Sequence, residues 1–474
     1  MESITDVNNK SIQEKTTAIQ RIFEAQRLFF DNGNTRNYTF RRNALISLKK
    51  SIKKYEKALI DAMYADYKKP ATEAYIGDIG VVLAELEFAI RHLKYWMEER
   101  RTSTPLTLYP ASSKIIYEPK GVVVIFAPWN YPFNLAISPL IGAIAAGNCV
   151  ILKPAHETPC TAEITTQIIS EAFLPEHVIT VMGDGREIGH LLLDNLVFNH
   201  IFFTGSASTG KWIMEKAAKN LTPVTLELGG KCPVIVDNSA RINTITKRIV
   251  WGKFFNAGQT CLAVDYILVH KDVKDKLIAQ LIKEIQTIYG NNAELSPDYC
   301  RIVNQERTEK IVNLMDGQDI LYGGKYNIEE CYIEPTVLDV NNMDSRIMQE
   351  EIFGPLLPIV TWKDESDVIE IVRKNRYPLA CYVFSEHKKF INFIHQNIEF
   401  GGGCVNNVLV HYANTNVGFG GVMTSGFGKY HGPHSFETFS NAKPVLSSFS
   451  LADLHIWYPP YSDTKLKVIK KVLG

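Results

Sequence analysis

One cysteine stands in a sequence context that suits nucleophilic chemistry. The segment Phe255-Asn-Ala-Gly-Gln-Thr-Cys261 places a thiol after a polar, glycine-containing turn and before the apolar run Tyr266–Val269, which has the character of a buried strand. A thiol at such a junction can face a cleft, where a reactant can reach it. We predict that Cys261 is the reactive thiol and that the remaining cysteines are core or incidental thiols.

A carboxylate and an amide stand at comparable junctions. Glu227, in Thr225-Leu-Glu-Leu-Gly-Gly-Lys231, ends a short run before two glycines. An apolar core cannot satisfy this carboxylate, so it is either solvated or aimed into a site. Asn130, in Pro128-Trp-Asn-Tyr-Pro132, lies between prolines that hold the backbone extended, and its amide can donate to an oxyanion. Nucleophile, base and oxyanion donor are the parts that acyl chemistry through a thioester requires.

The glycine turn Gly205-Ser-Ala-Ser-Thr-Gly210-Lys211 precedes the helical run Trp212–Asn220. Its backbone N–H groups would lie at a helix N-terminus, which favours phosphate. As G-x-x-x-x-G-K the turn is similar to a nucleoside triphosphate loop, but Trp212 stands where a Ser or Thr magnesium ligand is required. As G-x-A-x-x-G it is a dinucleotide-type turn with Ala207 in place of the middle glycine. We favour the dinucleotide interpretation; a purely structural turn stays open on this motif alone.

Apolar runs that alternate with helical segments must position these residues. The runs lie at 122–126, 149–152, 178–182 and 200–204, with helical segments at 162–173 and 186–193. This alternation predicts a parallel sheet with helices on both faces. The pattern restarts after residue 230, which predicts a second α/β domain. Upstream, the stripe Leu45–Ala62 predicts a helix that Pro70 stops, and residues 106–110 and 113–118 predict two strands joined by a turn.

Composition excludes several classes of protein. The 474 residues include 51 Lys and Arg and 51 Asp and Glu, so no basic field favours nucleic acid. Eight cysteines without a CxxC pair predict free thiols and a reducing, cytoplasmic compartment. His431 and His434 lack the spacing of a metal-binding helix, so we predict no metal. The polar N-terminus predicts no secretory signal, and the breakers within 135–152 predict no membrane span.

Five segments, taken in order, give the chain a family resemblance. They are Pro128-Trp-Asn-Tyr-Pro, Phe203-Thr-Gly-Ser, Leu226-Glu-Leu-Gly-Gly-Lys, Gly258-Gln-Thr-Cys and Glu351-Ile-Phe-Gly-Pro355. With these segments the chain resembles aldehyde dehydrogenases over nearly its whole length. Tyr430-His-Gly, Ser435-Phe-Glu-Thr-Phe439 and Trp457-Tyr-Pro-Pro-Tyr461 resemble the class 3 branch, which acts on fatty and aromatic aldehydes.

The resemblance implies oxidation of a medium- or long-chain aliphatic or aromatic aldehyde to its carboxylic acid, with NAD or NADP as cofactor. Cys261 would attack the carbonyl to give a thiohemiacetal and then a thioester. Asn130 and the backbone N–H of Cys261 would hold the oxyanion. Glu227 would activate the water that hydrolyses the thioester and is a candidate base for the thiol.

The resemblance also implies a set of cofactor contacts. The expected cofactor-binding residues are Lys153, His156, Gly205, Ser206, Gly210, Glu351 and Phe353. Many NAD-preferring members carry Glu where this chain has His156. Because a histidine does not repel a 2′-phosphate as a carboxylate would, NADP use is a hypothesis, although the neighbouring Glu157 is able to compensate. A second departure is Met423, where the family usually has Gly and a positive φ would be strained.

The same resemblance implies an α/β fold class with a Rossmann-like cofactor-binding domain, a catalytic domain and a small β arm. We place the cofactor-binding domain at 1–105 and 121–227, the catalytic domain at 228–400, the bridging and oligomerisation arm at 106–120 and 401–450, and a C-terminal tail at 451–474. The arm implies a homodimer. The basic amphipathic stretch Lys465–Leu473 is predicted to dock on its own body or on a partner subunit, with weak membrane-surface contact as the alternative.

Three other interpretations stay open. One is a CoA-acylating aldehyde dehydrogenase or a thioester hydrolase on the same scaffold, which Glu227 disfavours because an acylating enzyme tends to lack a water-activating base. Another is a catalytically silent structural homologue, which the presence of both Cys261 and Glu227 disfavours. The third concerns Phe255, which either packs in the core or lines a substrate tunnel.

Overall fold

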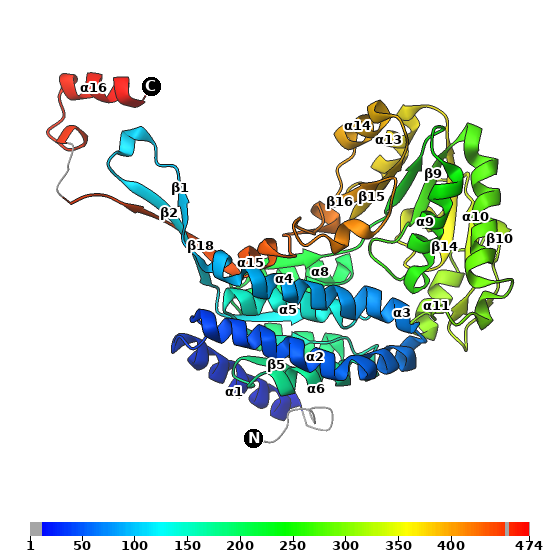
Figure 1. Cartoon of the computed structure of the whole chain (residues 1–474), viewed down its shortest axis with the longest axis horizontal. Coiled ribbons are helices and arrows are strands. Elements are labelled where there is room, and N and C mark those ends of the chain that lie inside the picture. Colours follow the sequence, from blue (N-terminus) through cyan, green and yellow to red (C-terminus); the bar gives the residue numbers. More distant parts are fainter. Residues whose placement is uncertain (1–11, 451–454, 474) are drawn as a thin grey trace.

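A computed structural model describes residues 12–450 and 455–473. Two large sheets with their helices form the body, and a β arm projects from it (Figure 1). In Figure 1 the helices around the first sheet occupy the lower part of the view and the second sheet lies at the right. The arrangement confirms the predicted α/β fold class.

The first sheet has six strands in the order β17-β7-β6-β3-β4-β5. Their bounds are β3 Val122–Phe126, β4 Cys149–Lys153, β5 Val178–Thr180, β6 His200–Thr204, β7 Val224–Glu227 and β17 Gly426–Phe427. All neighbours pair in parallel except β17, which runs antiparallel to β7. Strands β3, β4 and β6 are buried at every residue, which explains their continuous apolar runs.

Helices cover both faces of this sheet, as predicted. On one face, Val122, Val124 and Phe126 pack in a core with α1 (Ile12–Asp31), α7 (Gly185–Asn195) and α8 (Ala207–Ala218). On the other, Val123 and Ile125 pack with a larger group of helices. These are α2 (Tyr38–Tyr67), α4 (Gly80–Met97), α5 (Asn134–Ala146), α6 (Pro159–Ala172) and α15 (Pro433–Thr438).

A short irregular segment joins α2 to α4. Helix α2 ends at Lys68 in the left-handed conformation (φ 54°), two residues before Pro70. The chain then forms α3 (Ala71–Ala74) and a π-helical turn, η2 (Tyr75–Ile79), that runs directly into α4. Turns of π-helix are rare and occur frequently at functional sites.

The second sheet has seven strands in the order β10-β13-β14-β9-β8-β15-β16. The strands are β8 Pro233–Val236, β9 Tyr266–His270, β10 Asp319–Tyr322, β13 Thr336–Asp339, β14 Leu356–Trp362, β15 Ala380–Phe384 and β16 Gly402–Val405. Only β10 is antiparallel to its neighbour. The associated helices are α9 (Ile242–Phe254), α10 (Lys274–Tyr289), α11 (Gln305–Val312), α12 (Arg346–Gln349), α13 (Glu365–Lys374) and α14 (Lys388–Asn397). A small hairpin pairs β11 (Tyr326–Asn327) with β12 (Tyr332–Ile333).

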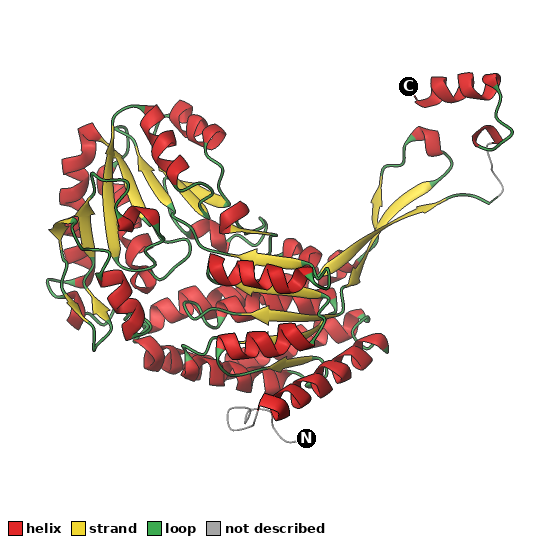
Figure 2. Ribbon diagram, turned by 180° about the vertical axis from the view of Figure 1, so that it is seen from behind, coloured by secondary structure: helices red, strands yellow, loops and turns green. Residues whose placement is uncertain are grey.

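The arm is a three-stranded antiparallel sheet, and Figure 2 shows it extending away from the body. It contains β1 (Arg100–Thr102), β2 (Ser112–Pro119) and β18 (Ser440–Ser447). The prediction of a strand at 106–110 was wrong, because residues 106–108 form a 3-10 turn that follows Pro105. The strand that pairs with β2 is the charged, exposed β1 instead.

The arm takes less of the C-terminal region than the range 401–450 that we predicted. Residues 402–405 form β16 at the edge of the seven-stranded sheet, and residues 426–427 form β17 beside β7. Neither segment carries an apolar run that marks it as a strand of a large sheet. Only β18 of this range belongs to the arm.

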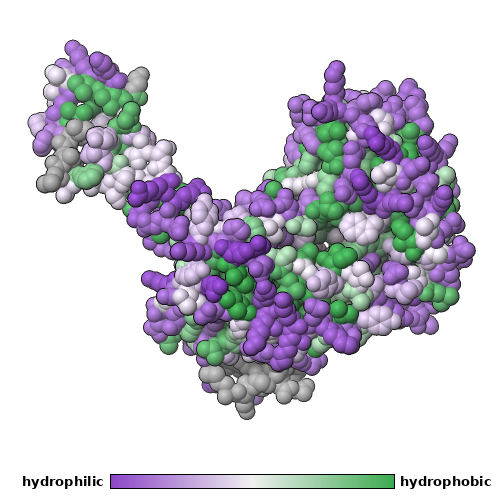
Figure 3. Space-filling model, in the orientation of Figure 1, coloured by the Kyte–Doolittle hydropathy of each residue, from purple (hydrophilic) through white to green (hydrophobic). Residues whose placement is uncertain are grey.

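The described part of the tail lies at the far end of the arm. It forms η9 (His455–Trp457) and α16 (Asp463–Leu473), neither of which contains a buried residue. Leu106, Leu108 and Leu466 are exposed at this end, where Figure 3 shows apolar groups gathered. Among the residues that the structure describes, no helix has the length and apolar character to cross a membrane.

Candidate active site

Cys261 lies at the end of a strained loop between α9 and β9. The loop opens with the turn η4 (Phe255–Gly258), in which Asn256 (φ 57°) and Ala257 (φ 50°) adopt left-handed conformations and Gly258 (φ 76°) follows. Gly258 is required there, because a Cβ atom at this position would lie 2.3 Å from the carbonyl oxygen of Gly354. Left-handed residues persist only where their surroundings hold them, and they cluster at functional sites.

The Cys261 thiol is half-buried and lines a cavity of about 200 Å³. Burial, with the negative charges of Glu351 and Glu227 as smaller causes, raises the pKa of this thiol to about 12. At neutral pH the thiol is therefore protonated in the free protein. A nearby base must take its proton if it is to act as a nucleophile.

Glu227 ends β7 and is buried, with 3% of its surface exposed. Neither of its carboxyl oxygens has a hydrogen-bond partner among the described residues. Burial raises the pKa of this carboxyl well above its ordinary value, and the charge of Lys429 opposes the shift. Gly420 approaches it closely, since a Cβ on this glycine would lie 3.1 Å from Glu227 Oε1. An unpartnered, buried carboxyl is suited to exchanging a proton with a ligand or water.

Asn130 follows β3 and is almost completely buried. Its Nδ2 donates to the carbonyl oxygen of Gln259 at 3.0 Å, two residues before Cys261. Because a side-chain amide has two N–H groups, one stays available for an oxyanion beside the cysteine. The structure thus brings Asn130 to the cysteine loop.

The cavity at Cys261 is almost entirely apolar. Its walls are formed by Ile76, Val81, Leu135, Trp251, Phe255, Leu409, Val410 and Ala413, and its polar groups include Thr260 and Tyr412. Phe255 therefore lines the cavity, and its ring stacks at 6.4 Å on that of Tyr131. Such walls favour an apolar ligand and offer no charged side chain to a charged one.

A second, larger cleft of about 640 Å³ lies at the carboxyl ends of the six-stranded sheet. Lys153 at the end of β4, Gly205 and Ser206 after β6, and His156 all line it. Ser206 caps α8 by accepting the N–H of Thr209. At Gly205 a Cβ would lie 2.5 Å from the Phe203 ring, so a side chain would not fit.

These features fit the phosphate and ribose groups of a dinucleotide. The Oγ1 atom of Thr204 is buried beside the N-terminus of α8 and has no partner in the described part of the chain. Backbone N–H groups at such a terminus favour phosphate. The buried Lys153 supplies a positive charge, and burial lowers its pKa. Within the described ranges 12–450 and 455–473, no group of histidine, cysteine, aspartate and glutamate side chains is arranged to hold a metal ion.

His156 lies between two carboxylates. Its Nδ1 is 3.2 Å from Glu157 and its Nε2 is 3.4 Å from Asp184. Asp184 caps α7 through the N–H groups of Arg186 and Glu187, and these bonds lower the pKa of its carboxyl. A phosphate that approached His156 would therefore meet two negative charges.

Gly210 does not line the cleft. It lies inside α8 on its buried face, where a Cβ would be 2.9 Å from Leu228 and 3.4 Å from Leu226. The glycine allows α8 to pack closely on β7, so its contribution is to helix–sheet packing. A helix follows the strand as predicted, but it begins at Ala207, inside the motif, and ends at Ala218, so this glycine faces the core rather than a phosphate.

Glu351 and Phe353 lie before β14, on the side of the second sheet. Glu351 accepts the N–H of Gly230, and burial raises its pKa to about 8. One of its oxygens, Oε1, is buried and has no partner within residues 12–450 and 455–473. Phe353 adopts a left-handed conformation (φ 51°) and its ring meets that of Trp129, which lines the cleft, at 5.4 Å.

Several residues at the site carry no signal in the sequence. Arg307 lies 4.7 Å over the Trp129 ring and lines the larger cleft with it. Trp251 and Tyr412 line the apolar cavity from distant elements. Only tertiary packing brings them together, so periodicity could not identify them. Glu157 was within reach of sequence analysis because it neighbours His156.

Comparison with known proteins agrees with this geometry. Residues 3–445 match the Aldehyde dehydrogenase family. The chain is 43% identical over 454 residues to 4,4′-diaponeurosporen-aldehyde dehydrogenase of Staphylococcus aureus, which covers 95% of this chain and 98% of that protein. It is 40% identical to aldehyde dehydrogenase family 3 member B1 of Mus musculus, over 95% of this chain and 96% of that one.

Solved structures show the same architecture. The substrate-bound state of Staphylococcus aureus AldH has a TM-score of 0.93 at 43% identity and covers 96% of this chain and 99% of its own. An indole-3-acetaldehyde dehydrogenase in complex with NAD⁺ has a TM-score of 0.83 at 27% identity, covering 92% and 89%. The glyceraldehyde-3-phosphate dehydrogenase GapN of Methanocaldococcus jannaschii in complex with NADP has a TM-score of 0.81 at 25% identity, covering 92% and 95%. The chain therefore belongs to the aldehyde dehydrogenase family, and its similarity to a family 3 member confirms the predicted branch.

Proposed function

We propose that this protein oxidises a medium- or long-chain aliphatic or aromatic aldehyde to its carboxylic acid with Cys261 as nucleophile. The observation that supports the proposal best is the position of Cys261 in a small apolar cavity, with Asn130 bonded to its loop. The apolar walls select the hydrocarbon part of the aldehyde, and the thiol meets its carbonyl carbon at the inner end.

The first covalent step forms a bond between Cys261 Sγ and the carbonyl carbon. The thiol proton leaves to Glu227 in its ionised form, while Asn130 Nδ2 and the backbone N–H of Cys261 hold the oxyanion of the thiohemiacetal. Fixed donors at a developing oxyanion are among the largest contributions to acyl-transfer catalysis. The dinucleotide, when bound, supplies the acceptor for the hydride that leaves the substrate carbon.

Glu227 releases the thiol proton to solvent and, ionised again, takes a proton from the water that attacks the thioester. Its raised pKa makes it a stronger base once it is ionised, and its two unpartnered oxygens leave room for a water molecule. This base supports release of an acid rather than transfer of the acyl group to CoA. A product assay in the presence of CoA distinguishes hydrolysis from acyl transfer, because the CoA-acylating alternative yields an acyl-CoA.

We propose that residues 1–105 and 121–227, which supply five strands of the six-stranded sheet, bind the cofactor and that residues 228–400 carry the nucleophile. Lys153 and Glu351 would hold the riboses, Ser206 would lie near the pyrophosphate, and Phe353 would contact the nicotinamide ribose. The close carboxylates of Glu157 and Asp184 favour NAD over NADP, in contrast to the hypothesis based on His156 alone.

The decisive experiment is a spectrophotometric panel of C2–C16 and aromatic aldehydes with each cofactor, with Cys261→Ser as the control. We expect reduced cofactor to form with apolar aldehydes and NAD, and no turnover in the Cys261→Ser variant. Absence of turnover with every aldehyde would support the silent structural homologue. A strong preference for NADP would overturn the cofactor assignment.

Two further properties are proposals. The projecting arm and the exposed α16 support a homodimer in which these elements meet a second copy. Light scattering of the chain with and without residues 448–474 tests this; a monomer of the full chain would contradict it. The eight free thiols support a reducing compartment, the cytoplasm. Weak contact of α16 with a membrane surface is the alternative for the tail, and liposome flotation tests it.

A further inference from the structure

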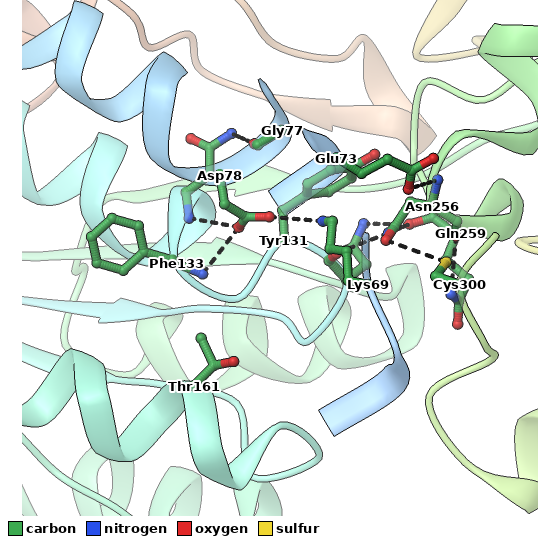
Figure 4. A network of polar contacts seen from close by, with 12 residues as sticks. Lys69, Glu73, Gly77, Asp78, Tyr131, Phe133, Thr161, Asn256, Gln259 and Cys300 are labelled. Atoms are coloured by element: carbon green, nitrogen blue, oxygen red, sulfur yellow. Dashed lines mark hydrogen bonds and ion pairs between the residues drawn. The ribbon is translucent and has the colours of Figure 1, made fainter. Parts of the chain in front are cut away.

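A buried polar network connects the segment between α2 and α4 to the nucleophile loop (Figure 4). We call residues 69–78 the brace. The brace contains α3 and most of the π-helical turn η2, and it lies outside every motif that the sequence pointed to. Figure 4 shows its side chains directed toward the loop around Asn256 and Gln259 and toward the start of α5.

The first contact of the brace holds the most strained part of the loop. The Glu73 carboxyl accepts the backbone N–H of Asn256 at 2.9 Å. Asn256 and Ala257 are consecutive left-handed residues, and such a pair needs outside bonds to persist. Glu73 provides one such bond at the residue where the left-handed turn begins.

Asn256 passes this constraint on to Asn130 and to Gln259, which lies two residues before Cys261. Its Nδ2 donates to the carbonyl oxygen of Asn130 at 2.9 Å and to that of Gln259 at 3.1 Å. The amide of Asn130 itself donates to the same carbonyl of Gln259. A displacement of Asn256 therefore moves the oxyanion donor and the approach to Cys261 together.

A second contact of the brace reaches the residue next to the nucleophile. Lys69 and Asp78 form a fully buried ion pair at 2.7 Å, and the Lys69 ammonium lies 4.1 Å from the centre of the Tyr131 ring. The Tyr131 hydroxyl bonds to Thr260 Oγ1 at 2.6 Å. Gly77 makes this packing possible, because a Cβ there would lie 2.7 Å from the Tyr131 ring.

We propose that Glu73 is a positioning residue for Cys261 and Asn130, and that it acts through the backbone N–H of Asn256. The acceptor oxygen is what matters, because the bond fixes the left-handed turn from which both functional residues are placed. Lys69, Asp78 and Tyr131 hold the other end of the same loop. The effect on turnover rests on the function proposed above, whereas the effect on the loop does not.

Glu73 can do this in either protonation state. Burial raises its pKa to about 7, against the smaller opposing effects of Lys69 and the Asn256 N–H. Both the carboxylate and the carboxylic acid present an oxygen that accepts an N–H. A glutamine presents the same acceptor, so it should replace Glu73 with little loss.

The test compares Glu73→Ala with Glu73→Gln, with Glu370→Ala as a matched control, since Glu370 is an exposed carboxylate on α13. Hydrogen–deuterium exchange of residues 255–261 reports the loop without any substrate. Steady-state kinetics with NAD and the best aldehyde report turnover. We expect Glu73→Ala to speed exchange in 255–261 and to lower kcat by about ten- to a hundredfold, with the KM for NAD within about twofold. Glu73→Gln should stay within about threefold of the parent in both measurements.

Three results would overturn the proposal. One is a Glu73→Ala protein with unchanged exchange and kcat. Another is a Glu73→Gln protein as slow as Glu73→Ala, which would assign the effect to charge. If Glu73→Ala does not fold, Glu73→Asp replaces it, because aspartate keeps the charge but withdraws the carboxyl by one methylene. The third overturning result would then be a Glu73→Asp protein with the parental kcat and exchange rate. If the parent oxidises no aldehyde, the function proposed above fails, while the exchange comparison still decides whether Glu73 holds the loop.

Discussion

The two large sheets present opposite edges to the site. The six-stranded sheet contributes residues from the carboxyl ends of its strands, with Lys153 ending β4 and Glu227 ending β7. The seven-stranded sheet contributes residues from its amino edge, because Cys261 precedes β9 and Glu351 precedes β14. Ligands of open α/β sheets ordinarily bind at the carboxyl edge, so only the first sheet follows the general rule.

The backbone differs accordingly on the two sides. The carboxyl edge leads into α7 and α8, whose regular N-termini are capped by Asp184 and Ser206. The amino edge carries left-handed residues at Asn256, Ala257 and Phe353. The regular side is suited to holding a ligand, and the strained side to fixing reacting groups in one geometry. Changes at the capped helix N-termini should therefore affect the KM for the dinucleotide, whereas changes at the reacting groups or in the left-handed segments should affect kcat.

The largest effect is expected from Glu227→Gln. The variant keeps the shape of the side chain but removes the base, so thioester hydrolysis should slow by roughly 10²–10⁴. In the parent, the raised pKa of Glu227 means that the base form is gained as pH rises, and hydrolysis should quicken toward alkaline pH. Single-turnover kinetics across pH check both points. A variant that retains the parental rate and pH profile would exclude Glu227 as the base.

The second largest effect is expected from Asn130→Ala. Loss of an oxyanion donor is expected to lower kcat by roughly 10²–10³, with little change in the KM for NAD. Steady-state kinetics measure the two constants, and Asn220→Ala, an exposed amide after α8, serves as the control. An increase in the KM for NAD at constant kcat would make Asn130 a cofactor contact and not an oxyanion donor.

Gly205→Ala tests the turn before α8, at the carboxyl edge of the six-stranded sheet. The added Cβ would lie 2.5 Å from the Phe203 ring, so either the ring or the turn must shift. Overpacking of this kind costs about 1–3 kcal/mol, and we expect the KM for NAD to rise roughly tenfold with kcat nearly constant. Titration of NAD binding by protein fluorescence gives an independent value. Unchanged binding would mean that the cofactor does not contact this turn.

The smallest effect concerns Met423, which has a φ of 53° and is exposed. Met423→Gly removes the left-handed strain at some cost in chain entropy, for a net gain of about 1 kcal/mol. Thermal unfolding should show a small rise in the transition temperature at unchanged kcat. Met214→Gly, at an exposed position inside the regular helix α8, should instead destabilise the protein. A lower transition temperature for Met423→Gly would show that the Met423 side chain stabilises the protein by more than its backbone strain destabilises it.

Strands buried on both faces could be predicted from the sequence. The apolar run at 122–126 coincides with β3, because a strand that is buried on both faces is apolar at every position. Strand β1 could not be predicted in the same way, since Arg100–Thr102 is charged and exposed and is held only by its pairing with β2. Residues 106–110 have strand-like composition, but a 3-10 turn forms there between two prolines.

The site was predictable to the extent that it follows local motifs. Cys261, Glu227 and Asn130 each lie at a junction that the sequence displays, and the structure places them around one loop and one strand end. Glu73 shows what the sequence cannot display, because it lies in the four-residue helix α3 and its contact with Asn256 spans 183 positions. Gly210 is the opposite case. It belongs to a motif that the sequence displays, but only tertiary packing shows that it faces the core and not the cleft.

The apolar cavity and the larger cleft have no lining residue in common. Substitutions that reshape one of them can therefore accumulate without altering the other. A lineage that inherits this scaffold is free to change the chain length or ring size of its aldehyde while it keeps its coenzyme, or to exchange the coenzyme while it keeps its aldehyde. Only the few residues between the cavity and the cleft, such as Asn130 and the loop that Glu73 holds, must suit both the aldehyde and the coenzyme.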